Sequence, residues 1–388
     1  MSIQFRRFAG VAIMIAAALS GMSCGTSSRQ AGILLAPSQG ATLIDSFGID
    51  LNSGALTQIH TGAPVPSGTA PSTILLDSTG STAYVANVAI SGATTHSGSI
   101  SAYTVKSDGT LTSVGNNTAT GADPIAMTMD PSGKFLLVVN QGSNNVSVFS
   151  IGSPGSLTEV PGSPFTTGTA PLPPSNALAA PAGVAVSTGN FVYVANQGQD
   201  TISAFTLDTG SGKLTAIPGS PFPAQMAPTG VGAMLTPSNT NLLFVANQGS
   251  NNVSAFNINT DGTLTEVTGS PYAAGLGPVA AVVDPSRNFL YVVDTTSNQL
   301  SNYRVNPGTG ALSPLTPSVV STGTNPVAAA FQPGGVGCTG NACMSNFLYV
   351  ANIGNDTISG FKMITQSGAL SSLTVATTDA RPTGVAVK

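Results

Sequence analysis

Residues 181–222 read PAGVAVSTGNFVYVANQGQDTISAFTLDTGSGKLTAIPGSPF, and this stretch decides the fold. It divides into four short segments, each bounded by residues that favour turns. The expected strands cover residues 183–187, 191–196, 201–207 and 214–217. The second segment is almost wholly apolar, which is typical of a strand that is covered on both faces.

The same pattern recurs along the chain, and each copy begins at a proline. Besides Pro181, copies begin at Pro71, Pro124, Pro228, Pro278 and Pro326, so successive copies start 47 to 57 residues apart. Four short strands at a period near 50 residues are the sequence signature of a β-propeller blade. The complete copies therefore predict six blades.

The two ends of the chain supply the parts of one more blade. Residues 382–388, PTGVAVK, match only the first strand of a copy, and residues 32–36, 43–51 and 55–60 match the other three strands. Pairing these segments would close the ring and remove exposed strand edges. We therefore expect an all-β, seven-bladed β-propeller with four antiparallel strands per blade. A split N- and C-terminal blade would close it, and residues 31–388 would form a single domain.

The first 23 residues are typical of a secretory signal peptide, because Arg6 and Arg7 precede an apolar stretch and a run of small residues. Cys24 follows, which resembles a bacterial lipoprotein signal, although Gly21 stands where that family usually has Leu. Lipid attachment at Cys24, with residues 24–30 as a tether, is one expectation, and ordinary signal cleavage is the other. Both predict an extracytoplasmic protein, either a membrane-anchored lipoprotein of the periplasm or outer membrane or a secreted chain.

The other two cysteines, Cys338 and Cys343, lie close together in one loop. In an oxidising compartment this spacing predicts a local disulfide. A metal site would need more ligands, and the sequence has no His or carboxylate within ten residues of this pair. We expect neither a metal nor a cofactor.

The charge of the chain narrows the range of partners. Charged residues make up 7% of the sequence and the net charge is −4, so there is no basic footprint for nucleic acid. We expect a monomer that meets a membrane only through its N-terminal lipid and whose ligand is a small molecule, a glycan or an envelope protein.

The second strand of several copies carries a recognisable motif. YVAN at residues 193–196 and 349–352, with FVAN at 244–247, resembles the repeat of lactonase-type, YVTN-repeat propellers over about residues 31–388. Some members of that family are 6-phosphogluconolactonases, and a related group contains muconate cycloisomerases. The resemblance implies a seven-bladed propeller and suggests a lactone hydrolase or cycloisomerase.

Several residues recur for reasons that are first of all structural. Asp77, Asp130 and Asp284 precede turns after the first strand and are expected to cap them. The second strand ends in Asn87, Asn140, Asn196, Asn247 and Asn352, with Asp294 in the remaining copy. These are turn residues or, alternatively, a ring of amides that faces a ligand. GSPF, at residues 162–165 and 219–222, is expected to end the outer strand as a turn and an apolar plug.

The first strands should line a central channel, and their small apolar residues include no ionisable side chain. General acid–base catalysis needs a titratable group and a phosphorylated substrate needs cations, so this wall argues against a catalytic 6-phosphogluconolactonase. The channel mouth is more polar. The residues before the seven first-strand prolines are Ala70, Asp123, Ala180, Ala227, Gly277, Asn325 and Arg381.

Asp123, Asn325 and Arg381 fall on one side of the predicted ring, and His96 lies on a long loop that could reach the same side. These four residues are the candidate ligand-binding site, and His96, Asp123 and Arg381 are the catalytic candidates. The alternatives are an Asp123–Arg381 surface salt bridge of little energetic weight and a solvated His96.

Three functions fit these observations. The first is a ligand- or partner-binding scaffold at the cell envelope, because the loop face is polar and uncharged. The second, implied mainly by the resemblance, is a lactone hydrolase or cycloisomerase in which His96 or Asp123 is the base and Arg381 the oxyanion partner. The third is a structural surface protein without a small ligand.

Overall fold

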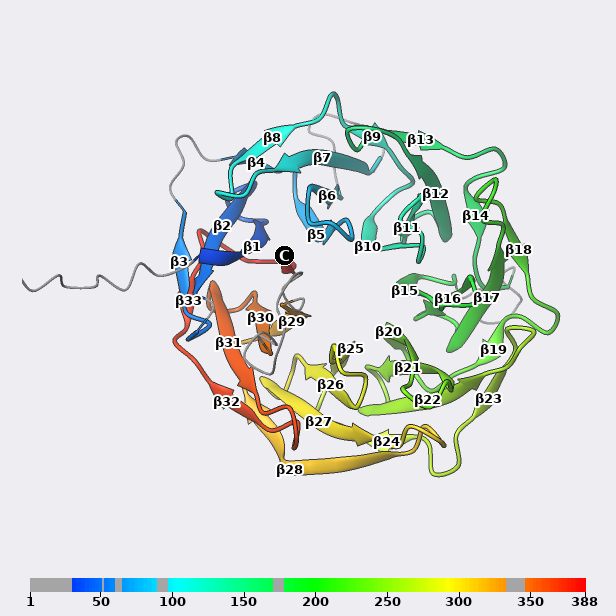
Figure 1. Cartoon of the computed structure of the whole chain (residues 1–388). Helices are drawn as coiled ribbons and strands as arrows, with labels where there is room; N and C mark the ends of the chain where they lie inside the picture. Colours follow the sequence, from blue (N-terminus) through cyan, green and yellow to red (C-terminus); the bar gives the residue numbers. More distant parts are fainter. Residues whose placement is uncertain (1–29, 51, 60–64, 89–96, 170–177, 333–345) are drawn as a thin grey trace, which may run out of the picture.

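The computed structural model describes residues 30–50, 52–59, 65–88, 97–169, 178–332 and 346–388, which form seven sheets arranged radially around a common axis (Figure 1). All strand pairs within the sheets are antiparallel, and each blade has four strand positions from the axis outward. The predicted seven-bladed β-propeller is thus confirmed. Among the described residues, no helix is long and apolar enough to cross a membrane.

Blades one to six follow one another along the chain, and each begins with its innermost strand. The innermost strands are β5 (Pro71–Leu76), β10 (Pro124–Met129), β15 (Pro181–Val186), β20 (Pro228–Leu235), β25 (Pro278–Val283) and β29 (Pro326–Phe331). All six begin at the prolines that the repeat predicted. Proline suits the first residue of a strand because it has no N–H to donate to the ladder.

The second strands are more deeply buried than the first. They are β6 (Thr82–Asn87), β11 (Phe135–Asn140), β16 (Phe191–Asn196), β21 (Asn241–Asn247), β26 (Phe289–Asp294) and β30 (Phe347–Asn352). The third strands are β7 (Ser99–Val105), β12 (Asn145–Ile151), β17 (Thr201–Leu207), β22 (Asn252–Ile258), β27 (Gln299–Val305) and β31 (Thr357–Met363). Every residue of β11, β26 and β30 is buried, as expected for strands covered by the neighbouring blades.

The outer strand is broken in two in most blades. Its pieces are β8 (Leu111–Ser113) with β9 (Thr118–Ala119), β13 (Leu157–Glu159) with β14 (Phe165–Thr166), β18 (Leu214–Ala216) with β19 (Phe222–Pro223), β23 (Leu264–Glu266) with β24 (Tyr272–Ala273), and β32 (Leu370–Ser372) with β33 (Ala376–Thr377). Only blade five, among the described blades, has a continuous outer strand, β28 (Leu312–Ser321).

The break corrects the expectation that GSPF ends the outer strand. The GSP segment interrupts that strand, and Phe165 begins its second piece. The Ser163 hydroxyl accepts a hydrogen bond of 2.9 Å from the Val148 N–H on the third strand, and Ser220 does the same for Ala204 at 2.8 Å. The serine replaces the carbonyl that the interrupted ladder lacks, which satisfies the buried backbone donor.

Blade seven is built from both ends of the chain, as predicted. Its strands from the axis outward are β34 (Ala386–Val387), β1 (Gln30–Ser38), β2 (Leu43–Asp50), and the pair β3 (Leu56–Gln58) and β4 (Val65–Pro66). Leu34 pairs with Val387 and Leu35 with Ala386. The Lys388 N–H donates to the Ile33 carbonyl at 2.9 Å, which extends this pairing to the last residue.

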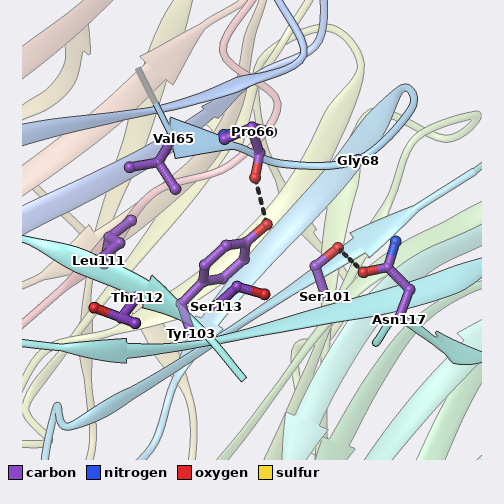
Figure 2. Close-up of a pocket in the computed structure, with 9 residues that line it drawn as sticks. All are labelled: Val65, Pro66, Gly68, Ser101, Tyr103, Leu111, Thr112, Ser113 and Asn117. Carbon is purple, nitrogen blue, oxygen red and sulfur yellow. Dashed lines mark hydrogen bonds between the residues drawn. The ribbon is translucent and has the colours of Figure 1, made fainter. Parts of the chain in front are cut away.

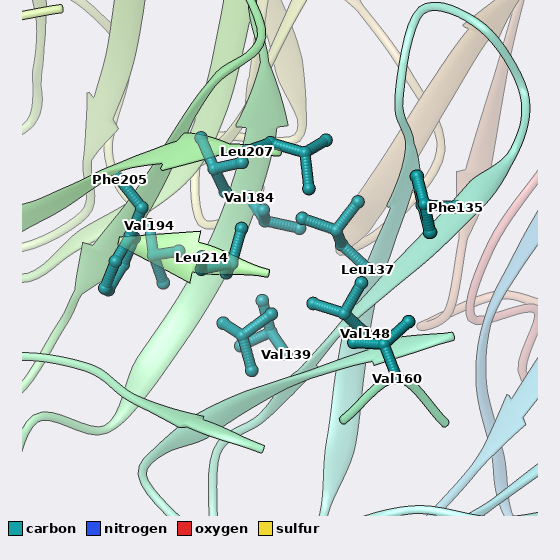
Figure 3. Close-up of a cluster of buried hydrophobic side chains, with 12 residues drawn as sticks. Phe135, Leu137, Val139, Val148, Val160, Val184, Val194, Phe205, Leu207 and Leu214 are labelled. Carbon is teal, nitrogen blue, oxygen red and sulfur yellow. The ribbon is translucent and has the colours of Figure 1, made fainter. Parts of the chain in front are cut away.

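Hydrophobic contact between neighbouring blades holds the ring together. Seven clusters of buried side chains occur, one at each junction between blades. Figure 3 shows the junction of blades two and three, where Leu137 and Val148 meet Val184 and Leu207. Since burial of each aliphatic side chain is worth about 1.5–3 kcal/mol, these clusters provide most of the stability of the ring.

Hydroxyl groups add a second contact between the innermost strands. The Thr229 hydroxyl donates to the Pro278 carbonyl of the next blade at 3.1 Å, and Thr383 reaches the Pro71 carbonyl at 2.9 Å. Ser72 makes the same contact with Pro124 at 2.5 Å. These bonds pin the starts of adjacent inner strands to each other.

Several predictions fall outside the described residues. The signal peptide and Cys24 lie in residues 1–29, His96 lies in residues 89–96, and Cys338 and Cys343 lie in residues 333–345. Export, lipid attachment and the disulfide therefore remain predictions.

Candidate functional site

One end of the propeller carries a ring of seven equivalent residues, each directly before an innermost-strand proline or its counterpart in blade seven. All seven have left-handed backbone angles, with φ between 42° and 67°: Ala70, Asp123, Ala180, Ala227, Gly277, Asn325 and Arg381. This conformation costs a non-glycine residue about 1–3 kcal/mol unless its surroundings impose it. The hydrogen bonds of this ring supply that constraint.

The carbonyl of each of these residues is held within its own blade. It accepts a bond of 2.9–3.2 Å from the N–H of the residue that follows the second strand, as in Gln141 to Asp123 and Gln197 to Ala180. The two innermost strands are thereby clamped together at this end of each blade.

The N–H of five of these residues, Ala180, Ala227, Gly277, Asn325 and Arg381, is held by the preceding blade. A side-chain oxygen of Asn144 accepts from the Ala180 N–H at 2.8 Å, and that of Asp356 accepts from the Arg381 N–H at 2.7 Å. Asp200, Asn251 and Asn298 make the same contact with the next blade, at 2.7–2.8 Å. Each of these five acceptors lies four residues after the residue that ends the second strand, and each has a left-handed φ of 54–56°. We call this contact the Asx latch.

The predicted site residues Asp123, Asn325 and Arg381 occupy this ring on blades two, six and seven. Asp123 Oδ2 lies over Gly142, where an added Cβ would sit 2.5 Å from it. Asn325 lies in the same way over Gly354, with Nδ2 3.2 Å from a Cβ built there. Within the described part of the chain, no hydrogen bond or ion pair joins these three side chains to one another or occupies their polar atoms. The structure does not describe His96.

The asparagines that end the second strands have a different role from the one expected. Their φ angles are not left-handed, and their side chains are fully buried. Asn196 Nδ2 donates to Ser203 Oγ at 2.9 Å, and Asn247 Nδ2 donates to Ser254 Oγ at 2.9 Å, in both cases within the blade. They tie the second strand to the third and do not form a ring that faces a ligand. The left-handed residue is the latch residue four positions later.

Asp294 replaces asparagine at this position in blade five. Its side chain is fully buried and accepts a hydrogen bond of 2.6 Å from Ser301 Oγ, while its other oxygen has no partner. Burial raises the pKa of Asp294 to about 6, against the opposing effect of the Ser301 hydrogen bond. Because this carboxyl lies inside the blade, it is unsuited to contact a ligand.

Sequence reasoning missed a chain of amides on the same end of the molecule. Gln141, Gln197 and Gln248 follow the second strands of blades two, three and four. Gln197 Nε2 donates to Gln248 Oε1 at 2.9 Å, and Gln141 Nε2 approaches Gln197 Oε1 at 3.5 Å. We call these three residues the amide arc. The sequence signal was the triplet Asn-Gln-Gly, which occurs in three consecutive copies.

The partial burial of the innermost strands indicates an open channel below this ring. In β10, β25 and β29 every residue after the proline is only half-buried, although each strand is surrounded by the rest of the propeller. Among the described residues, no group of three or more His, Cys, Asp or Glu side chains could hold a metal ion.

Two of the pockets lined by described residues lie on the outside of the ring. The first, of about 520 Å³, lies between blades seven and one and is drawn in Figure 2. Its lining residues are Val65, Pro66, Gly68, Ser101, Tyr103, Leu111, Thr112, Ser113 and Asn117. The Tyr103 hydroxyl donates to the Pro66 carbonyl at 2.5 Å and the Ser101 hydroxyl to Asn117 Oδ1 at 3.0 Å. With no ionisable group except this tyrosine, the pocket is poorly suited to acid–base chemistry.

The second outer pocket, of about 470 Å³, lies between blades four and five, and Glu266 is its one charged lining residue. The Glu266 carboxylate accepts a hydrogen bond of 2.9 Å from the Ser270 hydroxyl. Neither pocket includes a residue of the left-handed ring or of the amide arc.

Comparison with known proteins identifies related sequences. A family described as lactonase, 7-bladed β-propeller, matches residues 41–166, 163–269 and 219–331. A 6-phosphogluconolactonase of Bacillus subtilis is 24% identical over 274 residues, which cover 70% of this chain and 62% of the relative. The match therefore spans less than two thirds of the relative's own length.

Solved structures share the fold at lower identity. A Bacteroides uniformis protein, provisionally assigned as a 6-phosphogluconolactonase, superimposes with a TM-score of 0.76 at 19% identity, covering 93% of this chain and 100% of the other. A periplasmic gluconolactonase of Pseudomonas aeruginosa gives 0.73 at 20% identity, covering 92% and 98%. At these identities the likeness establishes a common fold.

Proposed function

This chain belongs to the 7-bladed β-propeller lactonase family, and from that premise we propose that it hydrolyses a lactone at the mouth of its central channel. The observation that carries the proposal is the nature of the seven ring residues. Asp123 and Arg381 are the two ionisable side chains among them, and no described residue occupies their polar atoms. The fold thus presents one carboxylate and one guanidinium on residues whose backbone carbonyls are fixed by hydrogen bonds.

Lactone hydrolysis needs a base for water and a donor for the developing oxyanion. In the proposed reaction the Asp123 carboxylate takes a proton from water, and the oxygen of that water attacks the lactone carbonyl carbon. The Arg381 guanidinium stabilises the tetrahedral oxyanion. The ring C–O bond then breaks, and the departing alkoxide takes the proton from Asp123, which gives the hydroxy acid. Asn325 is proposed to orient the substrate.

A binding module without catalysis is the second candidate. The innermost strands contribute no ionisable side chain to the channel wall, so catalysis would depend on the mouth alone. The similarity to lactonases supports hydrolysis over a pure scaffold. The predicted N-terminal signal would place either activity outside the cytoplasm.

Arg381→Ala tests the hydrolase proposal with D-glucono-1,5-lactone as substrate in a pH-stat assay. We expect kcat/KM to fall by about 100-fold or more, as for the loss of an oxyanion donor. The fold accepts alanine at this position, because Ala180 and Ala227 occupy it in blades three and four.

The matched control is Arg287→Ala. Arg287 is also exposed and left-handed, with a φ of 61°, but it lies on the turn between the first two strands of blade five, at the opposite end of the molecule. Unchanged turnover in Arg381→Ala would overturn the proposed site. Lactone binding without turnover in the unmodified protein would favour the binding module.

A further inference from the structure

The amide arc lies beside Asp123, the proposed general base. Gln141 and Gly142 directly follow β11, and the Asp123 carboxylate lies over Gly142. From Gln141 the arc continues through Gln197 to Gln248, at the end of each blade where the ring of left-handed residues lies. Asp123 and the arc therefore form one continuous polar surface across blades two, three and four.

The arc still has hydrogen-bonding capacity to offer a ligand. All three glutamines are half-buried. Each amide has two donor and two acceptor sites, and the internal bonds use one donor of Gln141, one donor of Gln197 and one acceptor each of Gln197 and Gln248. Neutral donors and acceptors held at fixed spacing suit hydroxyl groups, which can both donate and accept.

The charge around the arc itself disfavours an anionic ligand group there. Blades two to four contain two cationic residues, Lys134 and Lys213. Lys134 precedes β11 and Lys213 precedes β18, so both lie on turns at the opposite end of the blades. A phosphate bound at the arc would meet no cation of these three blades, and phosphate recognition normally depends on arginine or lysine.

Exposed apolar side chains lie on the loops beside the arc and one blade beyond it. Leu178, Met226 and Leu276 are 56%, 61% and 55% exposed, and they precede the innermost strands of three consecutive blades. Met226 lies against Gly249, next to Gln248, since a Cβ built on Gly249 would be 3.1 Å from Met226 Cβ. Sugar rings combine hydroxyl groups with apolar C–H faces, and this surface offers a partner for both.

We propose that the amide arc binds the hydroxyl groups of an uncharged sugar, so that the lactone cleaved at Asp123 is a neutral aldonolactone and not a phosphorylated one. This inference rests on the proposed function in that it takes the bound sugar to be a lactone. Sugar binding by the arc can be tested without turnover. The arc supplies the hydrogen bonds, and the exposed apolar side chains beside it contact the apolar face of the sugar ring.

The test uses Gln197→Ile and the non-hydrolysable D-gluconolactam, with binding measured by calorimetry. Ile353 occupies the equivalent position in blade six, so the fold accepts isoleucine there. We expect the variant to bind the lactam about tenfold more weakly, as for the loss of one or two hydrogen bonds. Gln366→Leu, an exposed glutamine on a turn at the other end of blade six, should bind as the unmodified protein does.

Lactone hydrolysis provides a second readout. Gln197→Ile should lower kcat/KM for glucono-1,5-lactone about tenfold but leave δ-valerolactone, which lacks hydroxyl groups, unaffected. If Gln197→Ile fails to fold, Gln248→Thr, which copies Thr295 of blade five, replaces it.

Three results would overturn the inference: no lactam binding by the unmodified protein, lactam binding unchanged in the variant, or preferred turnover of 6-phosphogluconolactone. If the lactam binds through the arc but no lactone is hydrolysed, the proposed function fails and the sugar site stands.

Discussion

Blades four and five share a hydrophobic cluster and the same chain path, yet they differ where the second strand ends and at the outer edge. Blade four continues from Asn247 into Gln248 and has a broken outer strand, whereas blade five continues from Asp294 into Thr295 and has the continuous strand β28. The Asx latch is the same in both, through Asn251 and Asn298.

The difference shows which contacts the propeller requires and which can vary. The cluster and the latch occur in both blades, so they carry ring closure. The buried strand end tolerates a carboxyl, at a cost in stability, and the amide arc stops where glutamine gives way to threonine. Stability and ligand binding therefore depend on different residues of the same blade.

Asn247→Asp should have the largest effect, since it puts the side chain of blade five into blade four. The Asn247 amide donates to Asn252 Oδ1 at 2.8 Å and to Ser254 Oγ at 2.9 Å. A carboxylate would lose both donors and face the Asn252 oxygen. We expect the free energy of unfolding at pH 8 to fall by about 3–4 kcal/mol, measured by urea denaturation.

The control for this variant is Asn239→Asp, which adds the same charge on an exposed turn. It should change the free energy of unfolding by less than about 0.5 kcal/mol. An equal loss in both variants would show that net charge, and not the buried strand end, sets the cost.

Asp294→Asn is the converse change and should stabilise the protein. The pKa of Asp294 is about 6 in the folded protein, above the ordinary aspartate value of 3.8. The folded state therefore holds a proton between pH 4 and 6 that the unfolded state has lost. The free energy of unfolding should fall as pH rises through this window, by about 3 kcal/mol in total, and then level off.

Asparagine at position 294 would remove this dependence. We expect the variant to be about 2 kcal/mol more stable than the parent at pH 8 and close to it at pH 4, as read from denaturation curves at both values. Ser301 can accept from the new amide, because Ser203 accepts from Asn196 in blade three. A parent protein whose stability is flat between pH 4 and 7 would contradict the assigned pKa.

Thr229→Val should have the smallest effect of the three. It removes the hydroxyl that contacts the Pro278 carbonyl of blade five. The equivalent residue of blade five is Val279, so that blade has no such hydroxyl. We expect a loss of about 1 kcal/mol in thermal or urea denaturation. Thr215→Val, on an exposed outer strand, should have almost no effect. A loss as large as that of Asn247→Asp would mean that this hydroxyl carries ring closure.

The sequence was sufficient for the architecture because its signals are local. A proline begins each innermost strand, turn residues separate the strands, and the unmatched segments at the two ends complete each other. The Asp turns were also predictable: Asp130 Oδ1 accepts from the Phe135 N–H at 2.7 Å, five residues along the chain. All of these contacts lie within one blade.

The sequence did not predict the contacts between different copies of the repeat. Asn144 recurs four residues after Asn140 in the same way as Asp200 follows Asn196, but its partner is a backbone N–H of the next blade. The Asn-Gln-Gly triplet was visible in the sequence, but the hydrogen bonds of the amide arc join glutamines of neighbouring blades. The raised pKa of Asp294 depends on burial by neighbouring strands. Asp123, Asn325 and Arg381 lie on the ring of left-handed residues, and their binding and catalytic roles remain proposals.

In the left-handed ring, the hydrogen bonds that hold the structure involve the backbone and not the side chain. This bears on which substitutions the protein can accept there. At all seven positions a hydrogen bond fixes the backbone C=O, and at five of them another fixes the N–H, whereas neither bond involves the side chain of the ring residue. Alanine, glycine, aspartate, asparagine and arginine all occupy it in this one chain. A single codon change there could exchange the chemical groups at the opening without refolding any blade. The backbone of the ring thus stays the same while the side chains that it carries vary.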